Sequence, residues 1–297
     1  MDINGIINIY KEEGYTSHDV VAIVKKLFKA KTGHTGTLDP NATGVLPICL
    51  GKATKLADYI MADTKGYKAT LKLGITTDTQ DIWGEVISTK DVNCSLEEIT
   101  NVVKSFVGKQ TQIPPMYSAI KINGKKLYEL AREGKEIERK SREIEVYSID
   151  ILSFNGKDEI TLDIVCSKGT YIRTICHDIG EKLGCGGSMV NLLRFKSGNF
   201  LVDNAIKISE LREKVENGDL SFIMPMETVF ANFTKIKAYE NAQKYIENGN
   251  KININLTNLD EKNTKKAEKY VVYDFEGKLV GIFEIAGDFL KPVTMLR

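Results

Sequence analysis

The chain has little net charge and few tryptophans, histidines and arginines. Its 297 residues include one tryptophan, three histidines and seven arginines, and the formal net charge is only +1. No large overall charge therefore steers the protein toward polyanions. The cysteines are odd in number and form no C-x-x-C pair (Cys49, Cys94, Cys166, Cys176 and Cys185). That usage favours reduced thiols over a disulfide framework, so we expect a cytoplasmic protein.

Signals for membranes and metals are also scarce. Residues 1–15 contain acidic side chains and lack a long apolar core, which predicts no secretory signal. No run approaches the roughly 18 apolar residues of a membrane span, so we expect no contact with a membrane. A zinc site is conceivable, but the spacing of its candidate ligands matches no common zinc pattern (Cys166, Cys176, His177 and Cys185). We therefore expect buried thiols and no metal.

The common nucleotide-binding loops are missing as well. No G-x-x-x-x-G-K-[ST] string occurs, although Gly33 and Lys52 flank a glycine-rich region. The glycines within residues 184–187 lack the strand-then-helix setting of a G-x-G-x-x-G fingerprint. The sequence therefore gives no sign of a bound dinucleotide or nucleoside triphosphate.

What the chain does have is a polar loop with a single acid. Residues 33–44 read GHTGTLDPNATG, so Asp39 stands among three glycines and several small polar side chains. Pro40 disfavours helical angles at Asp39. The segment is either an Asp-Pro-Asn turn or a loop that holds an acid against a ligand, and the extra glycines favour the loop. A glycosidase would need a second acid, for which Asp78 and Asp81 are weak candidates.

Arg173 and two tyrosines are the other candidates for chemistry. Residues 168–173 read KGTYIR, at an expected junction between strand and helix. An arginine there can pair with a carboxylate across a cleft and hold it ionised, or it is a surface residue of the first helical turn. Tyr67 and Tyr171 each have a lysine close by, a combination that suits stacking on a nucleobase. The alternative is that both tyrosines belong to the core.

Apolar patterning predicts strands and helices without a regular βαβ rhythm. Ser95 and Glu98 are spaced as a helix capping box, and Asn155 and Gly156 predict a hairpin between two long strands. The expected fold is α+β, with a mixed, largely antiparallel sheet flanked by helices. The expected strands are residues 5–10, 45–50, 67–73, 142–154 and 159–167, and the expected helices are residues 17–29 (capped by Ser17), 53–61, 95–107, 125–133 and 171–183.

The pattern of apolar and polar residues changes near residue 232. A short helix is expected over residues 235–246, then a turn and a polar stretch to residue 269. Three strands follow (residues 270–274, 279–285 and 293–296), which indicates a small C-terminal β-rich module. We therefore expect two domains, residues 1–231 and 232–297.

Four strings, in order along the chain, identify a resemblance. They are GHTGTLDP (residues 33–40), KGYK (65–68), CSKGTYIR (166–173) and EKLGCG (181–186). With these strings the chain resembles the bacterial TruB-type tRNA pseudouridine synthases, which isomerise the uridine at position 55 in the TΨC loop of tRNA. The likeness covers residues 5–200 well and extends to a C-terminal PUA-like RNA-binding module. It implies a pseudouridine synthase fold, an isomerase and no cofactor.

The resemblance also implies roles for individual residues. Asp39 is the catalytic aspartate, Tyr67 stacks on the flipped base and Arg173 pairs with Asp39. The remaining three residues bind the substrate: His34 enters the tRNA loop, and the pocket is lined by Tyr171 and Leu192. The expected partner is tRNA, bound by a monomer that needs no protein partner. Whether Asp39 attacks the sugar or the base stays open.

Two details of the sequence bear on RNA binding. Family members often have two adjacent arginines where this chain has only Arg194. Residues 121–142 carry eight basic and four acidic side chains, which form either a basic face or a solvated helix and loop. Phosphate contacts are expected from this segment and from the C-terminal module.

Three other functions remain as alternatives. The first is a non-catalytic RNA chaperone of the same fold. The second is a guide-dependent pseudouridine synthase that acts on ribosomal RNA with protein partners. The third is an unrelated glycoside hydrolase.

Overall fold

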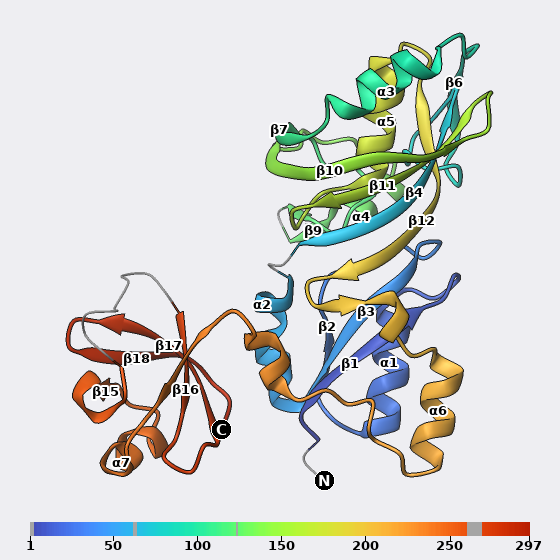
Figure 1. The fold of residues 1–297 in the computed structure, drawn as a ribbon. Coiled ribbons are helices and arrows are strands. Elements are labelled where there is room, and N and C mark those ends of the chain that lie inside the picture. Colours follow the sequence, from blue (N-terminus) through green and yellow to red (C-terminus); the bar gives the residue numbers. More distant parts are fainter. Residues whose placement is uncertain (1–2, 62–63, 123, 260–268) are drawn as a thin grey trace.

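The computed structural model describes residues 3–61, 64–122, 124–259 and 269–297, and within them two large sheets dominate (Figure 1). The larger sheet has nine strands, and one of its ladders is parallel while the others are antiparallel. Its main order is β1 (Gly5–Lys11), β3 (Thr43–Leu50), β12 (Gly187–Ser197), β4 (Lys65–Leu73), β11 (Glu159–Cys166), β10 (Arg142–Phe154) and β7 (Gly108–Gln112), with β2 (Thr32–His34) beside β3 and β13 (Phe200–Leu201) beside β12. The predicted α+β fold with a mixed, largely antiparallel sheet is confirmed.

Two helices pack on the β1–β3 half of this sheet. They are α1 (Ser17–Phe28) and α6 (Ile208–Glu216), which share one apolar cluster with β1 and β3. The helix predicted from residue 17 is present, but its N-cap is Thr16, whose hydroxyl accepts a hydrogen bond from the Asp19 amide at 3.1 Å. Thr16 and Asp19 form a capping box that the prediction overlooked. Ser17 is instead buried and exchanges hydrogen bonds with the backbone of Leu38.

The other half of the sheet is covered by α3 (Leu96–Lys104) and α5 (Ile172–Lys182). The capping box predicted for α3 from Ser95 and Glu98 is present. The predicted β10–β11 hairpin is also confirmed, because Asn155 Oδ1 accepts from three successive backbone amides after the turn. Both predictions depend on residues that lie within a few positions of each other. The sequence alone is enough to predict such local contacts.

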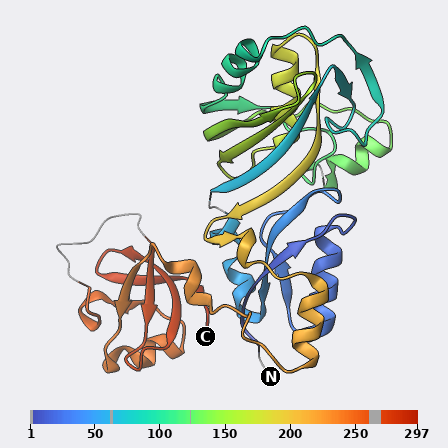
Figure 2. The same ribbon diagram turned by 45° about the vertical axis from the view of Figure 1, so that its right-hand side comes forward.

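Residues 187–197, to which the sequence patterning assigned no element, form β12. This strand pairs antiparallel with β4 and parallel with β3, so it joins the two halves of the sheet (Figures 1 and 2). Its ladder with β4 is interrupted by two register shifts. Such bulges break the alternation of buried and exposed side chains from which a strand is predicted.

Short elements complete the N-terminal part of the chain. The predicted helix over residues 53–61 begins as a 3-10 helix, η1 (Gly51–Leu56), and continues as α2 (Ala57–Met61). The predicted helix over residues 125–133 is shorter, because its first residues belong to a strand. The remaining elements are β5 (Ile75–Thr77), β6 (Val86–Thr89), β8 (Lys121–Ile122), β9 (Lys125–Lys126), α4 (Leu127–Arg132), η2 (Val202–Asn204) and η3 (Met226–Phe230).

The five-stranded C-terminal sheet has the order β14 (Thr234–Lys237), β16 (Lys269–Tyr273), β17 (Leu279–Ala286), β18 (Phe289–Met295) and β15 (Ile252–Asn253). Its other elements are η4 (Glu240–Ala242), α7 (Gln243–Glu247) and η5 (Ile254–Leu256). The single helix predicted over residues 235–246 is wrong at its start, because β14 pairs with β16 there and buries only Ile236. The last strand also begins earlier, at Phe289. The predicted polar stretch up to residue 269 lies largely outside the described residues, since 260–268 are not described.

The C-terminal sheet packs against η1 and α2. One apolar cluster joins Leu56 and Phe230 to Val271, Ile282 and Leu296. At its edge, the Lys55 ammonium donates to the Met295 carbonyl at 2.8 Å. No helix of the described part of the chain is long and apolar enough to cross a membrane.

Candidate active site

Asp39 and Arg173 meet across the two halves of the large sheet. Asp39 lies in the loop between β2 and β3, and Arg173 is the second residue of α5. Arg173 Nε lies 2.9 Å from Asp39 Oδ2, and Nη2 donates to Oδ1 at 3.3 Å. The guanidinium is 5% exposed, whereas the carboxylate is 40% exposed. One side of Asp39 is therefore held by a buried charge while the other remains open to a ligand.

The other donors of Arg173 are also occupied. Nη1 donates to the Thr79 carbonyl at 3.0 Å, and Nη2 donates to the Tyr117 carbonyl at 2.8 Å. Nη1 also lies 3.5 Å from Asp81 Oδ2. A guanidinium fixed by this many groups cannot turn away from Asp39 without leaving buried carbonyls unpaired, so its orientation is set before any ligand arrives.

Asp81 is a member of the site whose role the sequence did not indicate, since it was considered only as a possible second acid of a glycosidase. Burial raises the pKa of its carboxyl group, while a hydrogen bond from Thr79 Oγ1 at 2.7 Å and the charge of Arg173 oppose that shift. It approaches the far side of the same guanidinium that holds Asp39. The two acids therefore share one arginine, an arrangement that sequence spacing alone does not reveal.

Two buried cations hold the backbone on either side of Asp39. Arg194 on β12 donates to the carbonyls of Val45, Gly36 and Thr37 at 2.8, 3.0 and 3.4 Å. The sequence singled out Arg194 only as a departure that bears on RNA contacts, but the structure buries it beneath the loop. In the described part of the chain it forms no ion pair with an acid.

Lys11, at the end of β1, is the second of these cations. Its ammonium donates to the carbonyls of Pro40, Tyr15 and Glu12 at 2.9, 2.7 and 3.1 Å. Burial lowers the pKa of Lys11 to about 8, although the nearby charge of Asp39 opposes that shift. No sequence signal selects Lys11, because its partner Pro40 lies 29 residues away.

Gly44 shows how closely the loop approaches β12. Its φ is +107°, and a Cβ atom there would lie 2.2 Å from the Arg194 carbonyl oxygen. Any larger residue would therefore push the loop off the strand. Close contact with β12 therefore explains why a glycine occupies position 44 of the loop.

Tyr67 lies on β4, where its neighbours across the ladders are Arg194 and Ile164. It is buried, and burial raises the pKa of its hydroxyl group. The same apolar cluster contains Leu38, the residue before Asp39, and Leu192 on β12. The structure therefore brings Tyr67 and Leu192 together beneath the Asp39 loop.

The sequence matches models of a known family in its first 231 residues. The N-terminal domain of the TruB family pseudouridylate synthases matches residues 25–172, and the C-terminal domain of tRNA pseudouridylate synthase B matches residues 173–231. The chain belongs to the TruB family. The two matches meet inside α5, beside Arg173, so this boundary is not a structural one.

Named relatives agree with this assignment. The chain is 52% identical to a tRNA pseudouridine synthase B of Alkaliphilus oremlandii, covering 99% of this chain and 98% of the relative. It is 47% identical to the protein of that name from Clostridium perfringens, covering 94% of each chain.

Solved structures with the same fold are also similar. A Cbf5-Nop10-Gar1 complex matches with a TM-score of 0.76 and 26% identity, over 99% of this chain and 85% of that one. An H/ACA RNP bound to a substrate RNA containing 2′-deoxyuridine matches with a TM-score of 0.72 and 25% identity, over the same shares of the two chains. The fold of this TruB-family chain is therefore that of known pseudouridine synthases.

Two other residues that the resemblance predicted for the TruB-type site lie at its margin. His34 ends β2, and its ring meets the ring of His18 edge to face with centroids 5.7 Å apart. Burial lowers the pKa of His34, and the neighbouring His18 lowers it further. Tyr171 is the N-cap of α5, and its backbone exchanges hydrogen bonds with the side chain of Gln112. Within the described ranges, neither residue hydrogen-bonds to Asp39.

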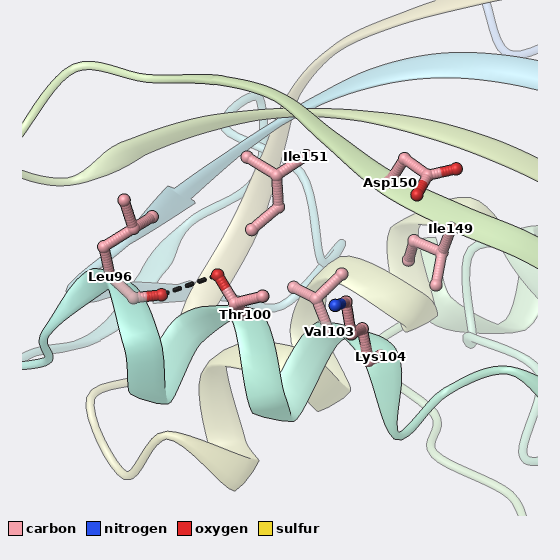
Figure 3. A pocket seen from close by; sticks show the side chains of 7 residues that line it. All are labelled: Leu96, Thr100, Val103, Lys104, Ile149, Asp150 and Ile151. Atoms are coloured by element: carbon pink, nitrogen blue, oxygen red, sulfur yellow. Dashed lines mark hydrogen bonds between the residues drawn. The ribbon is translucent and has the colours of Figure 1, made fainter.

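Cys166 and Cys176 lie buried in the apolar cluster that contains Tyr67, and a surface groove lies apart from this site. Burial raises the pKa of the Cys166 thiol to about 11 and that of Cys176 to about 12. The described residues contain no cluster of three or more potential metal ligands. A groove of about 340 Å³ opens between α3 and β10 (Figure 3), lined by Leu96, Thr100, Val103, Lys104, Ile149, Asp150 and Ile151. None of its residues belongs to the Asp39–Arg173 site.

Proposed function

We propose that this protein isomerises uridine to pseudouridine in the TΨC loop of tRNA, at position 55. The observation that carries the proposal is an aspartate with one open side, held by a buried arginine, in a chain of the TruB family. The reaction breaks the N1–C1′ bond of uridine and joins C1′ to C5, while C5 releases its proton and N1 takes up a proton. Atoms and electrons balance without an external oxidant or a second substrate.

In this proposal Asp39 acts on the target nucleotide and Arg173 positions it. The two-point contact fixes the carboxylate plane and leaves the exposed oxygen lone pairs open to a ligand. Holding a reactive group in one orientation removes part of the entropic cost of reaching the transition state. Both attack at C1′ and attack at the base are compatible with this arrangement.

The buried surface beneath the loop would receive the extruded uracil. Extruding a base costs a few kcal/mol, which stacking on Tyr67 and insertion of His34 into the RNA loop would offset. Leu192 and Tyr67 belong to one apolar cluster, and Tyr171 caps the neighbouring helix. An apolar pocket keeps water from the detached base and so disfavours hydrolysis.

Binding of the tRNA body is assigned to two other regions. Residues 121–142 keep exposed lysines, although Glu133 pairs with Lys125 and Lys135, and Glu136 with Arg139. We propose that residues 232–297 form a PUA-like RNA-binding domain, separate from a catalytic domain of residues 1–231. The likeness to the Cbf5-Nop10-Gar1 complex over 99% of the chain supports this. The protein acts as a cytoplasmic monomer on bare tRNA.

A guide-dependent synthase is the second candidate, because one structural relative is a Cbf5-Nop10-Gar1 complex and another is an H/ACA RNP bound to a substrate RNA. The relatives at 47–52% identity, all named tRNA pseudouridine synthase B, favour the first. Purified protein should convert an unmodified tRNA transcript without guide RNA, as measured by pseudouridine mapping. Conversion that required a guide RNA would favour the second candidate.

The catalytic assignment has its own test. Asp39→Asn should abolish detectable turnover while leaving tRNA binding largely intact, because the amide keeps the shape of the side chain but removes its charge. The matched control is Asp150→Asn, an exposed acid of the α3–β10 groove, which should react normally. Comparable rates for Asp39→Asn and the unmodified enzyme would disprove the role of Asp39.

A further inference from the structure

The only tryptophan of the chain stands exposed on the loop whose Asp81 contacts Arg173. Trp83 lies between β5 and β6 and is 60% exposed. Its neighbour Ile82 donates its amide to the Met189 carbonyl on β12 at 2.9 Å. A single exposed aromatic side chain is common on protein surfaces, so a role for Trp83 depends on where its loop lies.

The loop that carries Trp83, residues 77–84, is tightly bonded. The hydroxyl of Thr77 donates to the Asp81 carbonyl at 2.6 Å, and that of Thr79 donates to the Asp81 carboxylate at 2.7 Å. Gln80 adopts a left-handed φ of +64°, which a non-glycine residue rarely does, and its side chain accepts from Thr174 Oγ1 on α5 at 2.7 Å. Strain of this kind persists only where surrounding contacts enforce it. The exposed ring therefore stands on a rigid base.

A chain of contacts connects this base to Asp39. The Trp83 amide donates to Asp81 Oδ1 at 3.1 Å, and Asp81 Oδ2 lies 3.5 Å from Arg173. Arg173 in turn holds Asp39. Trp83 is thus three contacts from Asp39.

The charges of the loop indicate which part of an RNA it would contact. Residues 75–89 contain the acids Asp78, Asp81 and Glu85 and no lysine or arginine. Phosphate groups would be repelled by that charge, whereas the uncharged face of a base would not. A rigid aromatic ring loses little conformational freedom on stacking, and such stacking tolerates any base.

We propose that Trp83 is a stacking platform for an unpaired base of the substrate RNA, next to the target uridine rather than the target itself. This inference rests on the proposed function, since it takes tRNA as the substrate. Because Trp83 also shares Asp81 with Arg173, a base seated on the ring lies against the loop that positions the catalytic pair. The contact is distinct from the roles of Tyr67 and His34.

The single tryptophan makes the test direct. Asp39→Asn protein, which binds without turning over, is titrated with an unmodified T-arm stem-loop RNA while its fluorescence is recorded. Stacking should quench the emission, with a midpoint equal to the Kd from filter binding. Emission that stays unchanged at saturating RNA would overturn the proposal.

Substitutions of Trp83 test whether the aromatic ring stacks on a base or whether any apolar side chain would serve. Trp83→Ala should weaken RNA binding roughly tenfold to a hundredfold and leave the salt dependence of binding unchanged, because no phosphate contact is lost. Trp83→Phe should restore most of the affinity, whereas Trp83→Leu should not. The control Ile87→Ala removes a 68% exposed side chain of the same hairpin and should bind normally. Equal affinities for Trp83→Ala and the unmodified protein would overturn the proposal.

The outcome is independent of the test for the proposed function. Turnover of tRNA by the unmodified enzyme, together with normal kinetics of Trp83→Ala, would refute only the stacking platform. Absence of turnover in the unmodified enzyme would refute the proposed function whatever the fluorescence shows.

Discussion

The Asp39 loop and the C-terminal sheet are held in place by different kinds of contact. The loop depends on single polar bonds, from Lys11, Arg194 and Ser17 to its backbone. The C-terminal sheet depends on an apolar cluster of many side chains, among them Phe283 and Tyr270. A polar bond requires one donor in one position, whereas apolar burial is shared among neighbours. Substitutions should therefore act on catalysis in the loop and on stability or RNA affinity in the C-terminal sheet.

The largest effect is expected from Arg173→Met. This change removes the charge that holds Asp39 and leaves Asp81 without its cationic partner. We expect kcat to fall by about 10²–10³-fold and the free energy of unfolding to fall by about 3–5 kcal/mol. Stopped-time pseudouridine assays and urea unfolding measure the two effects. Arg173→Lys keeps the charge without the two-point contact, so it should recover stability more than rate; full activity of Arg173→Met would refute the positioning role.

Arg194→Met tests how strongly the Asp39 loop depends on the hydrogen bonds that Arg194 donates to its backbone. The variant leaves the carbonyls of Gly36, Thr37 and Val45 without their donor. We expect a loss of about 2–4 kcal/mol in the free energy of unfolding, and a lower kcat because Asp39 shifts. The control is Arg212→Met on the exposed face of α6. A variant that lost stability but kept kcat would show that the loop holds Asp39 without Arg194.

Phe283→Ala makes the opposite test in the C-terminal sheet. Phe283 is fully buried, so its truncation should cost about 3–5 kcal/mol of local stability. We expect KM for tRNA to rise while kcat at saturation stays unchanged, because the ring is remote from Asp39. Val293→Ala, an exposed change on the same sheet, serves as the control. A fall in kcat alone would contradict the division between the two regions.

The smallest effect is a pH dependence from Lys11. Because burial lowers its pKa to about 8, the unfolded chain binds more protons than the folded one between about pH 8 and 10.5. The contribution of Lys11 to stability therefore rises with pH across that window. In Lys11→Met this rise should be missing when urea unfolding is compared at pH 8 and pH 10. Identical pH profiles for the two proteins would argue against a buried, charged Lys11 beneath the loop.

Much of the fold could be predicted where the signal was local. The capping box of Ser95 and Glu98 and the turn at Asn155 involve groups within four residues of each other. By contrast, β12 was missed because its bulges disrupt alternation, and β14 was taken for a helix because only Ile236 among its four residues is buried. Pairing with β16, which is distant in sequence, makes residues 234–237 a strand.

Some residues of the site could likewise be predicted from the sequence, and others could not. Asp39, Tyr67 and Arg173 were selected from motif strings and a family resemblance, and the structure brings Asp39 and Arg173 into contact. Lys11 and the supporting role of Arg194 were not foreseen, because their partners are backbone carbonyls far along the chain. Any residue supplies such a carbonyl, so no side-chain pattern marks it. The catalytic assignments themselves remain predictions for the assays above.

One feature of β12 has a mechanical consequence. Its parallel ladder with β3 consists of two residue pairs, Leu193 with Thr43 and Arg194 with Gly44, and this narrow seam joins the halves of the large sheet. Asp39 belongs to one half and Arg173 to the other. The ion pair of Asp39 and Arg173 therefore also links the two halves of the sheet. If the sheet bent at this seam, Asp39 and Arg173 would separate. We therefore expect the rate of turnover to fall before the protein unfolds.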